Sequence, residues 1–267
     1  TDQEMAWIMD TYSINVGHTV PSVVTGKPIS IGGSLGRHEA TGRGVAYCAR
    51  RAVKHLNFTK EAPEVVVQGF GNVGSITAKY LHSAGYKIVG VSDVYGGIYS
   101  SKGLDIPSLM AYAQEHGSLA NFKDSEPVNN QELLELPCDI LIPAALGNQV
   151  NAQNMERIKA KILVEGANGP TSPEADLYLQ EKGVMVVPDI LANAGGVTVS
   201  YFEWVQGLMQ LFWTEDEVNS RLESIMGKAC DKVFALSQER NIRTRMAALW
   251  LGVSTIAEAK RLRGLYP

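Results

Sequence analysis

The chain has 267 residues, a formal net charge of −4 and an apolar fraction of 45%. The length allows one large domain or two small ones, and the apolar fraction predicts a sizeable buried core. The scattered basic residues form no electrostatic surface for nucleic acid. The longest uncharged runs fall short of the ~20 residues that span a bilayer, and no basic-then-apolar secretion signal opens the chain. We therefore expect a small-molecule partner, with no nucleic acid and no membrane.

The cysteines Cys48, Cys138 and Cys230 lie far apart and form no CxxC pair. Such spacing argues for free thiols in a reducing compartment and against a disulfide framework or a metal site. The sequence thus predicts a cytoplasmic protein without a bound metal.

The first fifth of the chain predicts helices around an irregular segment. Thr1 and Glu4 have the spacing of a capping box, which starts a helix near residues 2–12. A Gly- and Pro-rich stretch follows, and then a long helical pattern from about Glu39 to Leu56.

From residue 65 onward, apolar runs alternate with helical patterns. These runs are almost continuously apolar, as in parallel strands that are covered on both faces, and they occupy 65–69, 88–93, 139–143, 161–166 and 184–189. The helical segments between them have cap residues at Asp105 and Ser172 and glycine stops at Gly85, Gly117 and Gly183.

This alternation predicts a doubly wound, Rossmann-like parallel sheet with helical extensions at both termini. We expect one domain over 1–267, with its Rossmann-like core at about 60–195. Helices follow over about 196–267, with a break around 241–244.

The stretch VVVQGFGNVGS places Gly69, Gly71 and Gly74 in the order GxGxxG between a strand and a helix, the context of a dinucleotide-binding turn. Gly69 permits the tight turn, Gly71 leaves room for the pyrophosphate, and Gly74 lets the helix pack closely on the strand. The pyrophosphate would then lie at the positive end of the helix dipole.

Asp93 ends the next strand, 19 residues after Gly74, close to the ~20 expected for the acid that binds the adenosine ribose. The alternative role is to cap the turn SDVYGG. Residues 94–101 contain no Lys or Arg for a 2′-phosphate, which favours NAD. NADP stays open, because Lys102 is near.

Three loops at the carboxyl ends of successive strands each contain an asparagine: Asn148, Asn168 and Asn193. An amide both donates and accepts, so it can hold ribose hydroxyls or a carboxamide without adding charge beside the nicotinamide. The alternative is that each asparagine only fixes its own turn.

The motifs GRHEATGRG, QGFGNVG, EGANGPT and NAGGVTVSYFEWVQ occur in this order. With them, essentially the whole chain resembles the cofactor-binding half of a hexameric glutamate dehydrogenase, in the Glu/Leu/Phe/Val dehydrogenase superfamily. Two positions depart from the family pattern: Gly147 replaces the Glu of PAALENQ, and Val94 replaces a small polar residue. Both bear on ribose contacts and cofactor choice.

The resemblance implies roles for cofactor-binding residues. Thr41 would meet the nicotinamide carboxamide, Asn72 and Val73 would join the glycine turn, and Asn168 and Asn193 would line the nicotinamide ribose. For Thr41, the alternative is a helix-interior threonine that bonds back to its own turn. The flanking glycines 42 and 44 favour a close backbone approach instead.

The resemblance also implies substrate contacts: Ser200 would bind the side-chain carboxylate of L-glutamate, and Val197 would pack on its chain. A leucine, valine or phenylalanine dehydrogenase typically has an apolar residue at the Ser200 position. A nucleotide-binding module without catalysis is the remaining alternative.

The family's general base is a lysine in a GGGKGG-type loop, assisted by an aspartate in a PAPD-type stretch. Neither motif is present in the chain, and Lys27 in VTGKPISIGG is the nearest counterpart, which we interpret as a loop lysine. The resemblance thus implies that the N-terminal substrate and catalytic domain is absent from this chain. We expect it to bind a nicotinamide dinucleotide, to contain no catalytic residue and to be inactive unaided. The complete enzyme would be a homohexamer that converts L-glutamate to 2-oxoglutarate and ammonia.

Overall fold

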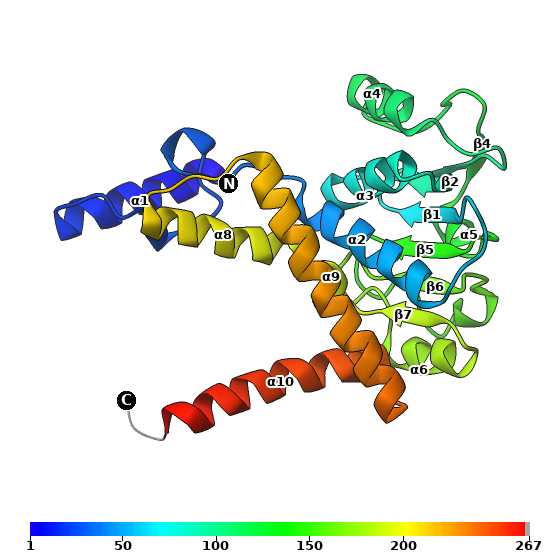
Figure 1. The fold of residues 1–267 in the computed structure, drawn as a ribbon. Coiled ribbons are helices and arrows are strands. Elements are labelled where there is room, and N and C mark those ends of the chain that lie inside the picture. The colour runs from blue at the N-terminus through cyan, green and yellow to red at the C-terminus, as the bar shows by residue number, and fades with distance from the viewer. Residues whose placement is uncertain (265–267) are drawn as a thin grey trace.

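The computed structural model describes residues 1–264 and is organised around a seven-stranded sheet in the order β4-β3-β2-β1-β5-β6-β7 (Figure 1). Strands β3 (Gly97–Tyr99) and β4 (Glu126–Val128) form an antiparallel edge. The other strands pair in parallel: β1 (Glu64–Gln68), β2 (Lys87–Ser92), β5 (Ile140–Pro143), β6 (Ile162–Val164) and β7 (Met185–Val187).

The chain reverses its direction of travel across the sheet at β1. From β1 it moves outward to β2, β3 and β4, and it then returns to the other side of β1 as β5. In an open parallel sheet, a crevice for ligands lies outside the carboxyl ends of the strands at such a reversal. The loops after β1 and β5 therefore flank the expected site.

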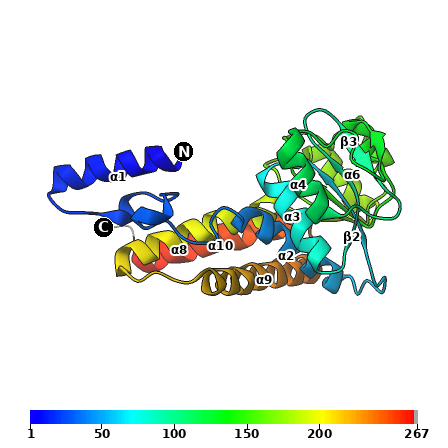
Figure 2. The same cartoon turned by 90° about the horizontal axis from the view of Figure 1, so that it is seen from above.

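The helices cover both faces of the sheet and extend beyond it (Figures 1 and 2). They are α1 (Asp2–Val16), α2 (Ala40–His55), α3 (Asn72–Ser83), α4 (Ile106–His116), α5 (Asn130–Leu134), α6 (Pro173–Glu181), α7 (Asp189–Ala192), α8 (Gly195–Met209), α9 (Glu215–Arg240) and α10 (Thr244–Arg263). Three short 3-10 turns, at Pro21–Val23, Ile29–Ile31 and Met155–Arg157, complete the description.

Alternate residues of the parallel strands enter two separate cores. Val65 and Val67 pack with α2, α3 and α9, whereas Val66 between them packs with α5 and α6. Leu141 and Leu163 join Val66 on its face. The interior positions of these strands are therefore almost all apolar, whereas β1 and β2 have polar residues at their ends. Each fully buried Val or Leu contributes about 1.5–3 kcal/mol to folding.

The structure confirms the predicted parallel strands, the helix near residues 2–12 and the long helix ending near residue 56. The capping box of Thr1 and Glu4 is present, and Asp105 and Ser172 cap α4 and α6 as predicted. The break near 241–244 is also confirmed, because α9 ends at Arg240 and α10 begins at Thr244. Of the helices predicted to residue 267, the last three residues lie outside the described part.

Three features were not predicted. β3 and β4 have three residues each, and α5 has five. The prediction of unbroken helix from residue 195 to the break at 241 was wrong, because α8 ends at Met209 and α9 begins at Glu215. There Gln210 has a left-handed backbone (φ 53°) and the Gln206 side chain accepts the Trp213 N–H, which turns the chain without Gly or Pro.

Helices α1, α8 and α10 project to the same side of the sheet, and α9 connects α8 to α10 (Figures 1 and 2). Large apolar side chains lie exposed on all three of them. Trp7 on α1 is 62% exposed, Trp204 on α8 is 41% exposed, and Ile256 on α10 is 72% exposed. An exposed apolar surface on several elements indicates an interaction surface.

The three cysteines are free thiols, and two of them touch. The Sγ atoms of Cys48 on α2 and Cys230 on α9 lie 3.2 Å apart, although 182 residues separate them. Contact with Cys230 and burial raise the pKa of the Cys48 thiol, and burial raises the pKa of Cys138 to about 12. Cys48 and Cys138 are therefore protonated and unreactive at neutral pH.

Helices α2 and α3 touch at Gly42. A Cβ at residue 42 would lie 2.6 Å from Ile76 Cβ and 2.7 Å from the Val73 carbonyl oxygen. We therefore expect Gly42→Ala to lower the free energy of unfolding by about 2–3 kcal/mol through overpacking. The matched change Gly252→Ala in α10 meets no atom within 4 Å and should raise it by up to about 1 kcal/mol. Urea unfolding measures both, and equal effects would contradict the contact.

Glu39, at the start of α2, accepts hydrogen bonds from Tyr80 and Lys79 on α3 and from Arg43. Burial favours its neutral form, but these hydrogen bonds and the cations outweigh burial and lower the pKa of Glu39 to about 2. The ionised carboxylate is therefore bound more strongly in the folded state than in the unfolded chain.

A lowered pKa stabilises the fold above the unfolded pKa of ~4.3 and ceases to do so as the pH falls through the folded pKa. We expect Glu39→Gln to lower the free energy of unfolding at pH 7 by about 1–2 kcal/mol, discounted for partial exposure. The deficit should shrink between pH 5 and pH 3 in urea titrations. Glu223→Gln removes an exposed ion pair and should show no such trend; a deficit for Glu39→Gln that does not change with pH would refute the assignment.

Candidate functional site

The glycine turn after β1 has the geometry that a pyrophosphate needs. Gly69 has a left-handed backbone (φ 91°), and a Cβ there would lie 2.9 Å from the Ala144 carbonyl oxygen in the loop after β5. A Cβ at Gly74 would lie 1.8 Å from the Gly69 carbonyl oxygen, so only glycine lets α3 pack this closely. At Gly71, by contrast, no atom lies within 4 Å of a Cβ position.

This turn leads directly into the N-terminus of α3. Gly71 is the N-cap residue, without a side-chain cap, and the first helical bond runs from Ser75 N to Gly71 O. The N–H groups of Asn72, Val73 and Gly74 therefore have no acceptor four residues earlier within the helix. Asn72 is exposed and Val73 is half-buried. Such amides and the helix dipole together attract an anion.

Asp93 follows β2 and binds the backbone of two loops. Its Oδ1 accepts from Tyr95 N (2.7 Å) and Gly96 N (3.2 Å), and its Oδ2 accepts from Leu119 N (2.9 Å). The turn-capping alternative is thus realised. A carboxylate has about four acceptor positions, and Asp93 is partly exposed, so its role toward a ribose stays a prediction.

The three asparagines lie in one hydrogen-bonded group at the carboxyl edge of the sheet. Asn193 Nδ2 donates to Asn168 Oδ1 at 2.7 Å, and the Asn148 amide donates to the Gly169 carbonyl at 2.8 Å. Asn148 itself has a left-handed backbone (φ 56°). The side chains of Asn148 and Asn168 are exposed, and that of Asn193 is partly exposed. The structure thus brings the three loops together, and the contacts of their asparagines with a cofactor stay a prediction.

Thr41 lies where α2 meets the start of α8. A Cβ at Gly196 would lie 2.4 Å from Thr41 Oγ1, and one at Gly195 would lie 2.1 Å from the Ala40 carbonyl oxygen. The predicted close backbone approach is confirmed. Within residues 1–264, the Thr41 hydroxyl makes no hydrogen bond, whereas Thr77 and Thr198 bond back to their own helices. The structure therefore does not support the alternative for Thr41.

Val197 and Ser200 lie one turn apart on α8 and share a face. Val197 is 69% exposed, and Ser200 is partly exposed. Because α8 begins two residues after Asn193, this face continues from the asparagine group. An apolar side chain and a hydroxyl on one exposed face suit a substrate with an aliphatic chain and a polar end.

Lys27 lies in a loop, as expected, but the sequence did not predict its surroundings. Its side chain is fully buried, and its Nζ donates to Glu203 Oε1 on α8 at 2.6 Å and to the Val24 carbonyl at 2.7 Å. Glu203 also accepts from the Gly26 and Lys27 amides. The pair therefore fastens the loop before α2 to the helix that presents Ser200.

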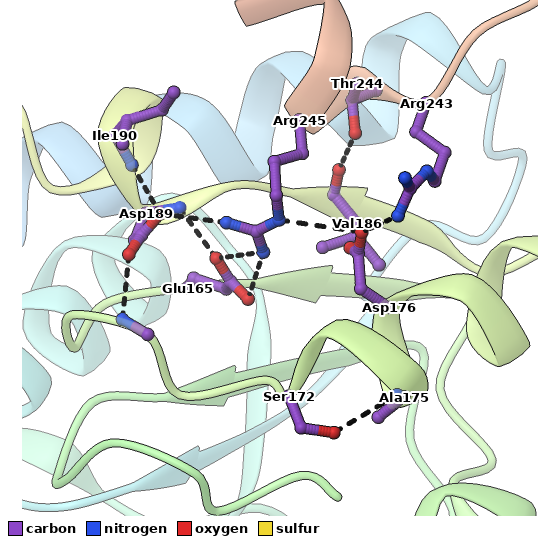
Figure 3. Close-up of polar contacts among 11 residues, drawn as sticks. Glu165, Ser172, Ala175, Asp176, Val186, Asp189, Ile190, Arg243, Thr244 and Arg245 are labelled. Carbon is purple, nitrogen blue, oxygen red and sulfur yellow. Dashed lines mark hydrogen bonds and ion pairs between the residues drawn. The ribbon is translucent and has the colours of Figure 1, made fainter. Parts of the chain in front are cut away.

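Sequence reasoning also missed an ionic cluster behind the asparagines (Figure 3). Arg245, at the start of α10, pairs with Glu165 after β6 and with Asp189 at the start of α7. Burial raises the pKa of Glu165, and the guanidinium opposes that shift. Burial would lower the pKa of Arg245, but its carboxylate partners outweigh burial and raise it. No local sequence signal reveals these pairs.

Within residues 1–264, no group of three or more His, Cys, Asp or Glu residues suits a metal ion, and no helix is long and apolar enough to cross a membrane.

Comparison with known proteins places these features in a family. The family model for glutamate/leucine/phenylalanine/valine dehydrogenase matches residues 32–264. The chain is 53% identical over 264 residues to a glutamate dehydrogenase of Thermotoga maritima, and 49% identical over 262 residues to an NAD-specific glutamate dehydrogenase of Staphylococcus aureus. These alignments cover 98% of the chain and 64% and 63% of the relatives.

Solved structures agree. The chain is similar to the hetero-hexameric glutamate dehydrogenase of Thermus thermophilus, with a TM-score of 0.91 and 39% identity, over 100% of this chain and 63% of that one. For the glutamate dehydrogenase of Peptoniphilus asaccharolyticus the TM-score is 0.87 at 37% identity, over 100% and 64%. The chain thus spans slightly less than two thirds of the length of these relatives. It belongs to the glutamate/leucine/phenylalanine/valine dehydrogenase family.

Proposed function

We propose that this chain is the cofactor-binding part of an NAD-dependent glutamate dehydrogenase. The complete enzyme would convert L-glutamate to 2-oxoglutarate and ammonia. The observation that carries the proposal is the turn at Gly69, Gly71 and Gly74. Gly69 and Gly74 must be glycines because a Cβ there would collide with neighbouring backbone, whereas a Cβ at Gly71 would face open space. Packing inside the protein therefore does not require glycine at position 71, which is the N-cap of α3. A bound phosphate would require it, because the phosphate must approach the backbone closely.

The remaining residues of the site fit the rest of a nicotinamide dinucleotide. The helix amides would hold the pyrophosphate, Asp93 the adenosine ribose, and the asparagine group the nicotinamide ribose. Thr41, whose hydroxyl makes no hydrogen bond within residues 1–264, would orient the carboxamide. When bound, the nicotinamide accepts a hydride from the substrate.

Several observations favour NAD over NADP. The loop after β2 contains no basic residue from Val94 to Ser101 that would receive a 2′-phosphate. Staphylococcal and Bacillus subtilis relatives are named NAD-specific. NADP remains the alternative, with Lys102 as the nearest cation.

For the substrate, Val197 would pack on the aliphatic chain and Ser200 would donate to the distal carboxylate. The hydrolysis of the imine that follows hydride transfer needs a general base. We propose that this base comes from the third of the relatives' length that this chain does not match, so that the chain alone binds cofactor without turnover. A hexameric complete enzyme is supported by the Thermus relative, whose printed description is hetero-hexameric.

Replacing Gly71 with valine tests the cofactor proposal. Because no atom lies within 4 Å of a Cβ there, Gly71→Val should leave the melting temperature nearly unchanged. The added side chain would occupy the pyrophosphate position, and we expect the dissociation constant for NADH, measured by fluorescence titration, to rise at least about tenfold. Gly252→Ala is the control. Unchanged NADH binding by Gly71→Val, or no NADH binding by the unaltered chain, would contradict the proposal.

Replacing Ser200 with valine tests the choice of substrate. In the complete enzyme, Ser200→Val removes the donor for the distal carboxylate and should lower kcat/KM for glutamate by about 10²-fold or more, with a much smaller loss for leucine. Ser200→Thr keeps the hydroxyl and is the matched control. If the ratio of the two kcat/KM values does not change, the apolar amino-acid dehydrogenases become the better assignment.

A further inference from the structure

The backbone of Gly169 connects the asparagine loops to the protein behind them. Its carbonyl accepts from the Asn148 amide, and its N–H donates to Asp189 Oδ2, both at 2.8 Å. The neighbouring residue is Asn168, whose side chain accepts from Asn193. The position of the Gly169 backbone therefore influences all three asparagines: Asn148 and Asn168 directly, and Asn193 through the side chain of Asn168.

Asp189 is the second junction. Its backbone carbonyl accepts from the Asn193 amide at 3.0 Å, which fixes the end of α7, and its Oδ1 accepts from Ile190 N at 2.8 Å. Its own amide donates to Glu165 Oε2 at 2.7 Å. Asp189 thus fixes Asn193 through the backbone and Gly169 through its side chain.

A single side chain holds both carboxylates. Arg245 donates through Nη2 to both oxygens of Glu165, at 2.7 and 2.8 Å, and through Nη1 to Asp189 Oδ1 at 3.0 Å. Figure 3 shows the guanidinium between Glu165 and Asp189, entering from α10. Its planar, multiply donating geometry suits this double contact, which the single ammonium of lysine cannot reproduce.

A second arginine near the start of α10, Arg243, provides a comparison for the contacts of Arg245 with Glu165 and Asp189. Arg243 precedes α10 and is similarly exposed, and its guanidinium pairs with Asp176 on α6 at 2.8 Å. Arg245 Nε also lies 3.5 Å from this carboxylate, but Arg243 has no contact with Glu165 or Asp189. Arg245 is 24% exposed, Asp189 is 14% exposed, and Glu165 is fully buried. Arg243 and Arg245 therefore anchor the same helix, and only Arg245 reaches the asparagine loops.

We propose that Arg245 is a positioning residue for the nicotinamide-ribose side of the cofactor site, acting through Glu165 and Asp189. This inference depends on the proposed function. Because Arg245 is the second residue of α10, a shift of this helix end against the sheet is transmitted to Gly169 and the asparagines. The glycine turn and Asp93 lie outside this set of contacts.

The test is the binding of two ligands, NADH and ADP, to this chain by isothermal titration calorimetry. ADP has the adenosine and two phosphates but no nicotinamide ribose, so it reports only on the glycine turn and the Asp93 side. We expect Arg245→Lys to raise the dissociation constant for NADH about fivefold or more. The constant for ADP should stay within about twofold, and Arg243→Lys should change neither.

The outcomes separate the inference from the proposed function. If the unaltered chain binds neither ligand, the proposed function fails and this inference with it. If it binds both, and Arg245→Lys leaves the ratio of the two constants unchanged, or Arg243→Lys changes that ratio as much, only the inference fails. Circular dichroism checks folding; should Arg245→Lys unfold, the double variant Glu165→Gln with Arg245→Gln removes both charges together and must shift the ratio in the same direction.

Discussion

Close packing at glycines determines how the helices of this molecule are arranged. At Gly74 the contact brings α3 against the turn after β1, at Gly42 it brings α2 against α3, and at Gly195 it brings α8 against α2. Each added methyl group would separate two elements that together form the site. Because these positions are glycines, three parts of the proposed site lie at the same edge of the sheet. They are the amides of α3, the hydroxyl of Thr41 and the exposed face of α8.

The local sequence was sufficient to predict most of the sheet, because strands buried on both faces are continuously apolar and their helices carry cap residues. It was insufficient at the edge, where β4 contains Pro127 and pairs only with β3. A proline in a three-residue run is not a strand signal, and only the sheet beside it supplies the pairing. The turn after α8 was not predicted either. Its chain reversal depends on the Gln206 side chain, which accepts the Trp213 N–H, and a glutamine is not a sequence signal for the end of a helix.

Some residues of the candidate site could likewise be predicted from local sequence, and others could not. The glycines and asparagines could be predicted because each acts through its place in a local strand, turn and helix pattern. Asp93 remained open between two roles, because the same side chain serves turn capping and ligand binding. The ion pairs of Arg245 with Glu165 and of Lys27 with Glu203 join residues 80 and 176 positions apart. Only the folded chain brings such partners together, since a charged residue in a sequence does not indicate which opposite charge will be buried with it.

The distance along the chain between Lys27 and Glu203 has a consequence for biosynthesis. At about 5–20 residues per second, a ribosome needs roughly 9–35 s to add the residues between them. During that interval the strands can pair, but Lys27 still lacks its partner Glu203. The loop that contains Lys27 therefore reaches its final conformation only after α8 has been synthesised, later than strands that follow it in the sequence.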